Sequence, residues 1–199
     1  MGQNHRDIIL GSASPRRREL LAALDIKFTV DTDNTFSEKY EEGTPACEVP
    51  VLMSRGKSYG FHRSLSPAEI LITADTVVII DDNVLGKPHS AEEAARMLRE
   101  LSGRTHKVVT AVTIRDCERE KTFSDTSIVS FKHITDSEIQ YYIEHYRPFD
   151  KAGAYGIQEW IGYAKIDKLE GSFYNVMGFP TDKVYDVLQE FTKQPEDDA

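Results

Sequence analysis

The apolar residues of this chain follow two spacings, one typical of strands and one typical of helices. Runs of β-branched residues and alternating polar positions predict strands at Ile8–Leu10, Phe28–Val30, Ile70–Thr73, Val77–Ile80, Val84–Leu85, Lys107–Ile114, Lys121–Phe131 and Tyr163–Ile166. Apolar residues three and four positions apart predict helices at Pro15–Leu24, Val49–Phe61, Ala91–Leu101, Ile139–Tyr146 and Thr181–Phe191. Because strands and helices alternate along the chain, we expect an α/β fold with a mixed sheet.

Local signals indicate where three of these helices begin. Ser90 and Glu93 have the spacing of a capping box, and so do Thr135 and Glu138. Ser14–Pro15 has the composition of an N-cap followed by the first helical residue. We therefore expect helices to start directly after Ser14, Ser90 and Thr135.

The composition does not divide the chain into separate units. A length of 199 residues suits one sizeable domain, and no Pro-, Gly- or Ser-rich linker and no internal repeat separates the predicted elements. With 40% hydrophobic residues, the chain has enough apolar material for a core. We expect a single domain over residues 1–199, with a polar tail at about residues 193–199.

The charge balance limits the classes of partner. The 33 acidic side chains outnumber the 24 basic ones, which gives a formal net charge of -9. Such an excess disfavours binding to polymeric nucleic acid and to anionic membrane surfaces, which both attract cations. A small anion needs only a few cations in one place, so an acidic protein can still bind one.

The ends and the cysteines predict a cytoplasmic protein. Residues 1–7 are polar, and the short apolar run after them is shorter than the roughly 7–15 apolar residues of a signal peptide. No stretch approaches the roughly 20 apolar residues that span a bilayer. Cys47 and Cys117 are far apart in sequence, which favours neither a disulfide framework nor a thiolate zinc site.

Three consecutive arginines occupy the start of the first predicted helix. The segment Ser12–Arg18 reads S-A-S-P-R-R-R. Cations in a first helical turn are unfavourable against the helix dipole by about 0.3–1 kcal/mol each, so their presence there calls for an anion. Hydroxyls such as Ser12, free backbone N–H groups and guanidinium groups together suit a polyanion. The alternative is that the arginines are solvated or pair with acids elsewhere in the chain.

Asp75 interrupts the most apolar part of the sequence. It follows Ile70–Ala74 and precedes Val77–Ile80. A buried carboxylate is costly unless it meets a cation, a metal or several hydrogen-bond donors. Asp75 is therefore either a hydrogen-bonded structural acid or a catalytic one. In the catalytic case it would hold Mg²⁺ or activate water, which suits hydrolysis of a phosphoanhydride.

Two lysines and a glycine-rich segment supply further candidates. Lys87 follows the predicted hairpin that Asp75 leads into, and Lys57 lies in the preceding helix, so both can reach phosphate near Asp75. Either lysine alone would ordinarily be a solvated side chain. Asp150–Gln158 reads D-K-A-G-A-Y-G-I-Q, in which Tyr155 and Gln158 could stack on or hydrogen-bond to a base. The alternative for this segment is a turn that leads into a strand.

Taken together and in order, six segments resemble the Maf family, the septum-formation-inhibitor-like nucleoside triphosphate pyrophosphatases. These segments are Ser12–Leu21, Ala74–Thr76, Leu85–Pro88, Met97–Gly103, Asp150–Gln158 and Gly171–Gly178. The resemblance extends from about Ile8 to Phe191. It implies an elongated α/β fold with a cleft between two lobes, often a homodimer, in a cytoplasmic enzyme that splits a nucleoside triphosphate into the monophosphate and pyrophosphate with a divalent cation such as Mg²⁺ or Mn²⁺.

The resemblance also implies roles for particular residues. The branch that prefers dTTP and UTP carries Arg, Thr and Gln at three selectivity positions, which match Arg16, Thr76 and Gln158. The proposed general base of the family matches Asp75. The basic residues that bind phosphate match Arg17, Lys57 and Lys87. Thr76 and Gln158 would then recognise the edge of the pyrimidine.

One departure from the family pattern lies after the second predicted strand. The family often has a glutamate there, whereas Asp31–Thr35 offers Asn34 or Asp33. Metal affinity or preference could differ if that glutamate helps to hold metal. The sequence contains no convincing nucleophile, since Ser12 and Ser14 lack the G-x-S-x-G pattern of serine hydrolases. The alternative to an enzyme is a nucleotide-binding regulator of cell division without significant turnover.

Overall fold

The computed structural model describes residues 6–192, so the predicted tail at 193–199 lies outside the described residues. The strands are β1 (Asp7–Leu10), β2 (Phe28–Val30), β3 (Glu69–Ile80), β4 (Asn83–Leu85), β5 (Thr105–Arg115), β6 (Glu120–Phe131) and β7 (Ile166–Glu170). The helices are α1 (Pro15–Ala22), α2 (Val49–Tyr59), α3 (Ala91–Leu101), α4 (Asp136–Tyr146), α5 (Trp160–Lys165), α6 (Phe173–Met177) and α7 (Thr181–Thr192), with a short 3₁₀ turn at Ala152–Ala154.

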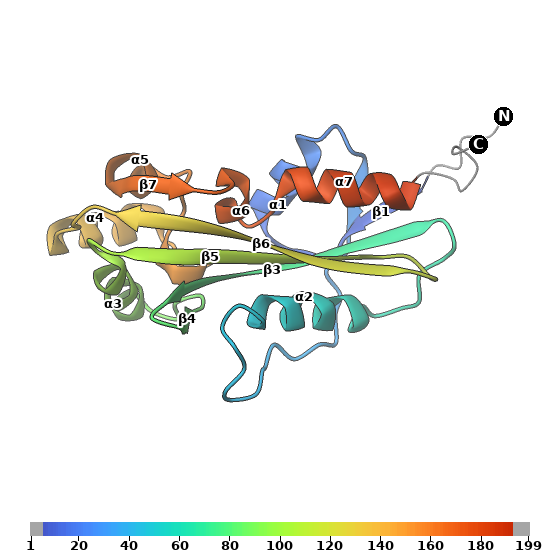
Figure 1. The fold of residues 1–199 in the computed structure, drawn as a ribbon, viewed down its shortest axis with the longest axis horizontal. Coiled ribbons are helices and arrows are strands. Elements are labelled where there is room, and N and C mark those ends of the chain that lie inside the picture. The colour runs from blue at the N-terminus through green and yellow to red at the C-terminus, as the bar shows by residue number, and fades with distance from the viewer. Residues whose placement is uncertain (1–5, 193–199) are drawn as a thin grey trace.

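The strands of residues 6–192 form one mixed sheet. Its order is β2-β1-β3-β5-β6-β7, and β4 pairs with β3 outside this path. Strand β1 is parallel to β2 and β3, whereas every other pairing is antiparallel. The long strands β3, β5 and β6 run along the whole elongated sheet, with helices at both ends (Figure 1). The predicted α/β fold with a mixed, elongated central sheet flanked by helices is confirmed.

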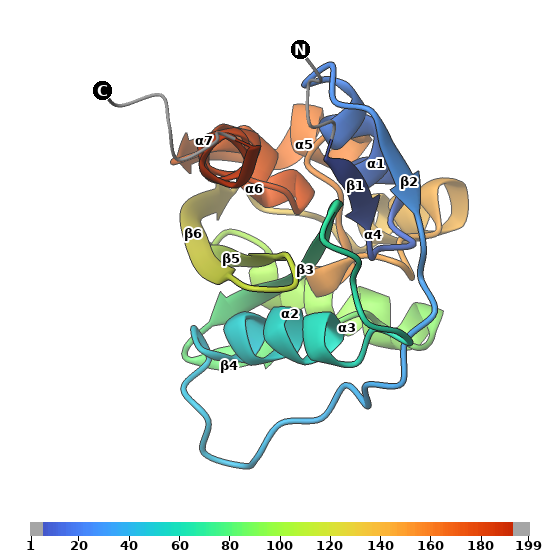
Figure 2. The ribbon, with the colours of Figure 1, turned by 90° about the vertical axis from the view of Figure 1, so that its right-hand side faces the viewer.

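Helices cover both faces of this sheet, and Figure 2 shows α2 on one side and α1, α6 and α7 on the other. The alternation of side chains along β3 explains this arrangement, because successive residues point to opposite faces. Ile70 and Ile72 pack in the same cluster as α1 and α7. Val77 and Ile79 pack with Met53 of α2.

Two large apolar cores lie at different places along the sheet. One contains residues of α3, α4 and the segment after α4, including Leu98, Tyr142 and Ile157. The other contains residues of α1 and α7, including Leu21 and Leu188. The same long strands contribute to both cores, so the two lobes share one sheet.

Two predicted strand boundaries differ from the structure. The residues Ile70–Thr73 and Val77–Ile80 belong to a single strand, because β5 pairs continuously with β3 across Asp75. The predicted strand at Tyr163–Ile166 is wrong, since α5 extends to Lys165 and β7 begins at Ile166. Ile161 is buried in the core while Tyr163 is exposed, and this short apolar pattern fits a helical turn as well as a strand.

The predicted helix starts are confirmed, but their capping contacts differ. Thr135 and Glu138 form the complete reciprocal box at α4. At α3, Ser90 accepts from the backbone N–H of Glu93, whereas the Glu93 carboxylate accepts from the N–H of His89. Ser14 is the N-cap of α1 without a side-chain capping bond.

His106 makes the stability of the fold sensitive to acid. Its ring is 2% exposed on β5, its Nε2 lies 2.7 Å from the Tyr155 hydroxyl, and burial lowers the pKa of His106 to about 4. A histidine in the unfolded chain has a pKa of about 6.5, so protons bind the unfolded state preferentially between these values. The stabilisation is therefore complete above pH 6.5 and is lost as the pH falls towards 4.

We expect the free energy of unfolding to fall with acidification more steeply for the wild type than for His106→Gln, which does not titrate. The difference between pH 6.5 and 4 should be on the order of 3 kcal/mol. Urea unfolding at several pH values measures it. His133→Gln, which replaces an exposed histidine, is the control and should retain the wild-type pH dependence. Parallel curves for the wild type and His106→Gln would contradict the prediction.

Candidate active site

A cavity of about 460 Å³ opens beside the middle of β3, between the two cores. Its walls come from the β1–α1 loop and the start of α1, the loop after β2, α2, β3, the loop after β4, the segment between α4 and α5, and the end of α6. All eight residues that the sequence predicts for the site line this cavity, namely Ser12, Arg16, Arg17, Lys57, Asp75, Thr76, Lys87 and Gln158. The fold therefore brings distant segments into one pocket, and the roles of these residues remain predictions.

A gap in the sheet edge explains why the pocket lies at this point. On the edge of β3 opposite β5, β1 pairs with residues 69–72 and β4 pairs with residues 78–80. No strand of residues 6–192 pairs with that edge at Asp75 and Thr76. Their side chains point to opposite faces of the sheet, but the gap makes both reachable from one cavity.

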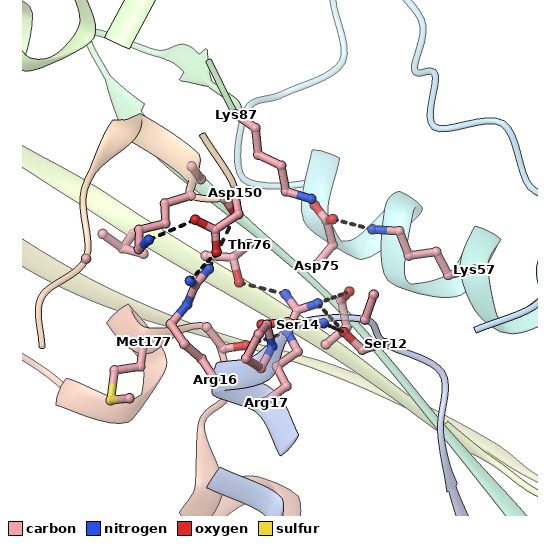
Figure 3. Close-up of a pocket in the computed structure, with 18 of the residues that line it drawn as sticks. Ser12, Ser14, Arg16, Arg17, Lys57, Asp75, Thr76, Lys87, Asp150 and Met177 are labelled. Carbon is pink, nitrogen blue, oxygen red and sulfur yellow. Dashed lines mark hydrogen bonds and ion pairs between the residues drawn. The ribbon is translucent and has the colours of Figure 1, made fainter. Parts of the chain in front are cut away.

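Asp75 pairs with a lysine of the helix that covers its face of the sheet. The Lys57 Nζ lies 2.6 Å from Asp75 Oδ1, and both side chains are 16% exposed. The same Nζ lies 3.1 Å from Glu38 Oε1. Figure 3 shows Lys57 and Lys87 approaching Asp75 from different sides. The carboxylate that interrupts the apolar strand is thus compensated by a cation and faces the cavity.

The guanidinium of Arg17 donates hydrogen bonds to acceptors in three different parts of the chain. Its Nε donates to the Gly178 carbonyl at 2.9 Å, Nη1 donates to the Ala74 carbonyl at 2.8 Å and to Ser12 Oγ at 3.3 Å, and Nη2 donates to Thr76 Oγ1 at 3.0 Å. Burial lowers the pKa of Arg17 to about 10. Because four of its five N–H groups are used, Arg17 offers one N–H to a phosphate.

Gly178 allows α6 to approach this guanidinium. Its φ is +104°, which is the left-handed region that favours glycine. A Cβ atom at this position would lie 3.1 Å from Thr76 Oγ1. The close packing of the α6 end on Thr76 and Arg17 therefore requires a glycine.

The hydroxyl of Thr76 is oriented by a relay through β5. Thr110 Oγ1 donates to the Asn175 carbonyl at 2.9 Å, so it accepts from Thr76 Oγ1, which lies 2.9 Å away. The Thr76 oxygen also accepts from Arg17. Since a hydroxyl has one proton and two lone pairs, Thr76 can offer only an acceptor to a ligand.

Arg16 extends from α1 to the opposite wall of the cavity. Its Nη1 donates to Asp150 Oδ2 at 2.7 Å, and its Nη2 donates to the Asp150 carbonyl at 3.4 Å. Gln158 lies in the same wall, and its Oε1 is buried without a hydrogen-bond partner among the described residues. This Oε1 is therefore an acceptor that a ligand N–H could satisfy.

Sequence reasoning assigned no role to three charged residues that line the pocket, Glu38, Asp150 and Lys151. Asp150 and Lys151 were visible only as the start of the glycine-rich segment. The glutamate expected after the second strand has no equivalent at Asn34, whose side chain accepts from the Phe36 N–H and donates to the Lys57 carbonyl. Glu38, four residues later, supplies the loop carboxylate that reaches the pocket.

The interpretation of Tyr155 as a hydrogen-bond partner for a base needs correction. Its ring lines the cavity but is buried, and its hydroxyl interacts with His106 Nε2. Burial also raises the pKa of Tyr155, which keeps the phenol protonated. The ring of Tyr155 therefore forms part of the pocket wall, and its hydroxyl is hydrogen-bonded to His106 rather than available to a ligand.

Comparison with known proteins gives the family of the chain. The family described as "Maf-like protein" matches residues 7–191. The chain belongs to this family. A dTTP/UTP pyrophosphatase of Porphyromonas gingivalis strain W83 is 53% identical over 186 residues, covering 92% of this chain and 94% of that protein. A dTTP/UTP pyrophosphatase of Bacteroides thetaiotaomicron is 46% identical over 182 residues, with 92% and 94% covered.

Among solved structures, a HAM1 protein from Coxiella burnetii has a TM-score of 0.48 and 16% sequence identity, covering 93% of this Maf-like chain and 99% of that one. No helix within residues 6–192 is long and apolar enough to cross a membrane.

The acidic residues of the Maf-like pocket suit a divalent cation that is shared with a ligand. Within residues 6–192, no group of three or more His, Cys, Asp or Glu side chains is arranged to bind a metal ion. Asp75 and Glu38 converge on Lys57, which gives a pair of carboxylates. Mg²⁺ is commonly bound by one or two carboxylates plus substrate phosphates, so this donor set fits a cation that arrives with a triphosphate.

Proposed function

We propose that this chain hydrolyses dTTP and UTP to the monophosphate and pyrophosphate. The observation that carries the proposal is the charge of the pocket, in which five cations and three carboxylates leave an excess of two positive charges. A nucleoside triphosphate with one bound divalent cation carries the complementary excess of negative charge. The activity named for the relatives at 53% and 46% identity supports the same reaction.

The cations have complementary tasks in this proposal. Lys57 and Lys87 bind phosphate oxygens together with the free N–H of Arg17, while Arg16, held by Asp150, contributes positive charge from the wall that carries Gln158. Lys87 supports this role because its ammonium makes no hydrogen bond or ion pair within residues 6–192. Phosphoryl transfer requires positioning and charge stabilisation more than covalent chemistry, so a set of cations around one strand gap suits it.

Asp75 is the proposed catalytic residue. Its carboxylate accepts a proton from the water that attacks the α-phosphorus, and pyrophosphate leaves. Lys57 orients the carboxylate through the 2.6 Å contact. When a divalent cation is bound, Asp75 would hold it, with Glu38 as a second carboxylate, and the cation would neutralise charge on the phosphates.

Thr76 and Gln158 are the proposed residues for the base. Thymine and uracil carry an N3–H donor, which matches the unpartnered Oε1 of Gln158. Cytosine carries an acceptor at that position, which would leave two acceptors facing each other. This difference favours dTTP and UTP over CTP.

Three further expectations remain predictions. Residues 1–199 form one catalytic domain, the protein is cytoplasmic, and it assembles as a homodimer. The shared sheet supports the first, because β3, β5 and β6 contribute to both cores.

A panel of triphosphates tests the proposed function. We expect pyrophosphate release from dTTP and UTP in the presence of Mg²⁺ or Mn²⁺, much slower release from CTP, ATP and GTP, and loss of release when EDTA removes the cation. The assay measures pyrophosphate and, in parallel, nucleotide binding. Binding of dTTP without release of pyrophosphate would favour a nucleotide-dependent regulator instead.

A further inference from the structure

Behind Arg16 lies a network of charged and polar groups that the proposed reaction does not use. Asp150 accepts from Arg16 through Oδ2 and from the Lys151 Nζ through Oδ1, at 2.7 and 2.8 Å. Each oxygen of the carboxylate therefore holds a different cation. Asp150 is 52% exposed and stands between the pocket and the buried part of the network.

Lys151 connects Asp150 to the protein interior. Its side chain is 8% exposed, and its Nζ lies 3.1 Å from Glu159 Oε1. The other oxygen of Glu159 accepts from the Tyr142 hydroxyl, whose pKa is raised by burial, so the phenol remains a donor. A buried lysine between two carboxylates restricts where Asp150 can lie.

The same network holds the segment that carries Gln158. The backbone N–H of Gly156 donates to the Tyr142 hydroxyl at 2.9 Å. A Cβ atom at Gly156 would lie 3.0 Å from both Lys151 Cε and Glu159 Cδ, so the chain packs directly on this ion pair. Gln158 follows two residues later, and its place in the pocket depends on these contacts.

We propose that Asp150 is a positioning residue that sets base selectivity by holding Arg16 in a fixed place relative to Gln158. The proposal rests on the proposed function. Arg16 belongs to α1, which packs on one core, whereas Gln158 follows Ile157 of the other core. An arginine has several rotatable bonds, and an unrestrained Arg16 could turn towards the phosphates, which all nucleoside triphosphates share. Asp150 keeps it where it can distinguish bases.

The substitution Asp150→Asn tests this role without changing the size of the side chain. Arg16 and Lys151 bind different oxygens of the Asp150 carboxylate, so in the amide one of these two cations faces an NH2 donor instead of an acceptor. We expect the ratio of kcat/KM for dTTP to kcat/KM for CTP to fall about tenfold, mainly through a higher KM for dTTP, because hydrogen bonds to charged groups contribute roughly that much. The kcat for dTTP should stay within about twofold.

Asp136→Asn is the matched control. Asp136 accepts from Arg99 Nε at 2.6 Å on the surface and does not line the pocket, so its loss should leave the ratio unchanged. Unfolding by urea checks that both variants are folded. A general loss of structure would lower kcat for every substrate, whereas a change in the ratio alone reports on positioning.

A double-mutant cycle shows whether Asp150 acts through Arg16. Arg16→Ala should lower the dTTP-to-CTP ratio, and adding Asp150→Asn should lower it no further. Additive effects, or an unchanged ratio in Asp150→Asn, would overturn the proposal.

Equilibrium binding of non-hydrolysable dTTP and CTP analogues is measured on the same variants. If the wild type releases no pyrophosphate, the proposed function fails, and the ratio of the two binding affinities still tests the role of Asp150. Equal binding of both analogues by the wild type would overturn that role.

Discussion

Asp75→Asn should lower the rate of pyrophosphate release from dTTP by about 10²–10⁴-fold, the usual contribution of a general base. The amide has the size of the carboxylate and can still accept from Lys57, but it cannot take a proton from water. Lys57 also retains its contact with Glu38, so we expect the free energy of unfolding to change by about 1 kcal/mol or less.

Binding separates the chemical role of Asp75 from a structural one. Without a divalent cation, removing a negative charge beside the phosphates should leave the affinity for a non-hydrolysable dTTP analogue unchanged or raise it, while kcat measured with the cation falls. Titration calorimetry and single-turnover kinetics measure the two quantities. A fall in affinity that accounts for the whole loss of kcat/KM would assign Asp75 to substrate binding.

Asp125→Asn is a closely matched control. The Asp125 carboxylate accepts from a lysine at 2.6 Å and is 17% exposed, which resembles the pairing and exposure of Asp75, but it does not line the pocket. We expect this variant to retain near-normal turnover. Near-normal turnover of dTTP by Asp75→Asn, or an equal loss in both variants, would refute the catalytic assignment.

Arg17→Lys should destabilise the fold by about 3 kcal/mol although it keeps the positive charge. The guanidinium of Arg17 donates to Ser12, Ala74, Thr76 and Gly178, and these four acceptors lie in different directions. An ammonium group has three donors at one atom and cannot reach them all. Urea unfolding measures the loss.

The activity of Arg17→Lys should fall together with its stability. Arg17 joins the β1–α1 loop, β3 and the end of α6, and small displacements of such elements can cost about 10²-fold in kcat/KM. Arg18→Lys changes the neighbouring, exposed arginine of the same triplet, so its free energy of unfolding should change by about 0.5 kcal/mol or less. Equal effects in the two variants would show that Arg17 acts as one surface charge among several.

Most elements of the fold could be predicted because their signals are local. The burial pattern of α7 places Val184, Val187 and Leu188 in the core, as the helical spacing predicts. The capping box of Thr135 and Glu138 lies within one helical turn, so the local sequence is enough to predict it. The segment Tyr163–Ile166 was mispredicted because a few apolar and polar residues satisfy both periodicities, and only the packing of Ile161 selects the helix.

The sequence by itself indicated most of the elements, the family and eight residues that line one pocket, since each depends on residue types within short segments. The tertiary structure alone decided how those residues are used. The gap between β1 and β4 opens Asp75 and Thr76 to one cavity, although they point to opposite faces of the sheet. The hydrogen-bond partners of Arg16 and Arg17 come from distant segments. The residues next to an arginine in the sequence do not indicate which acceptors its long side chain will contact in the fold. Adjacent arginines therefore look alike in the sequence, yet one spans the pocket and the other holds its walls together.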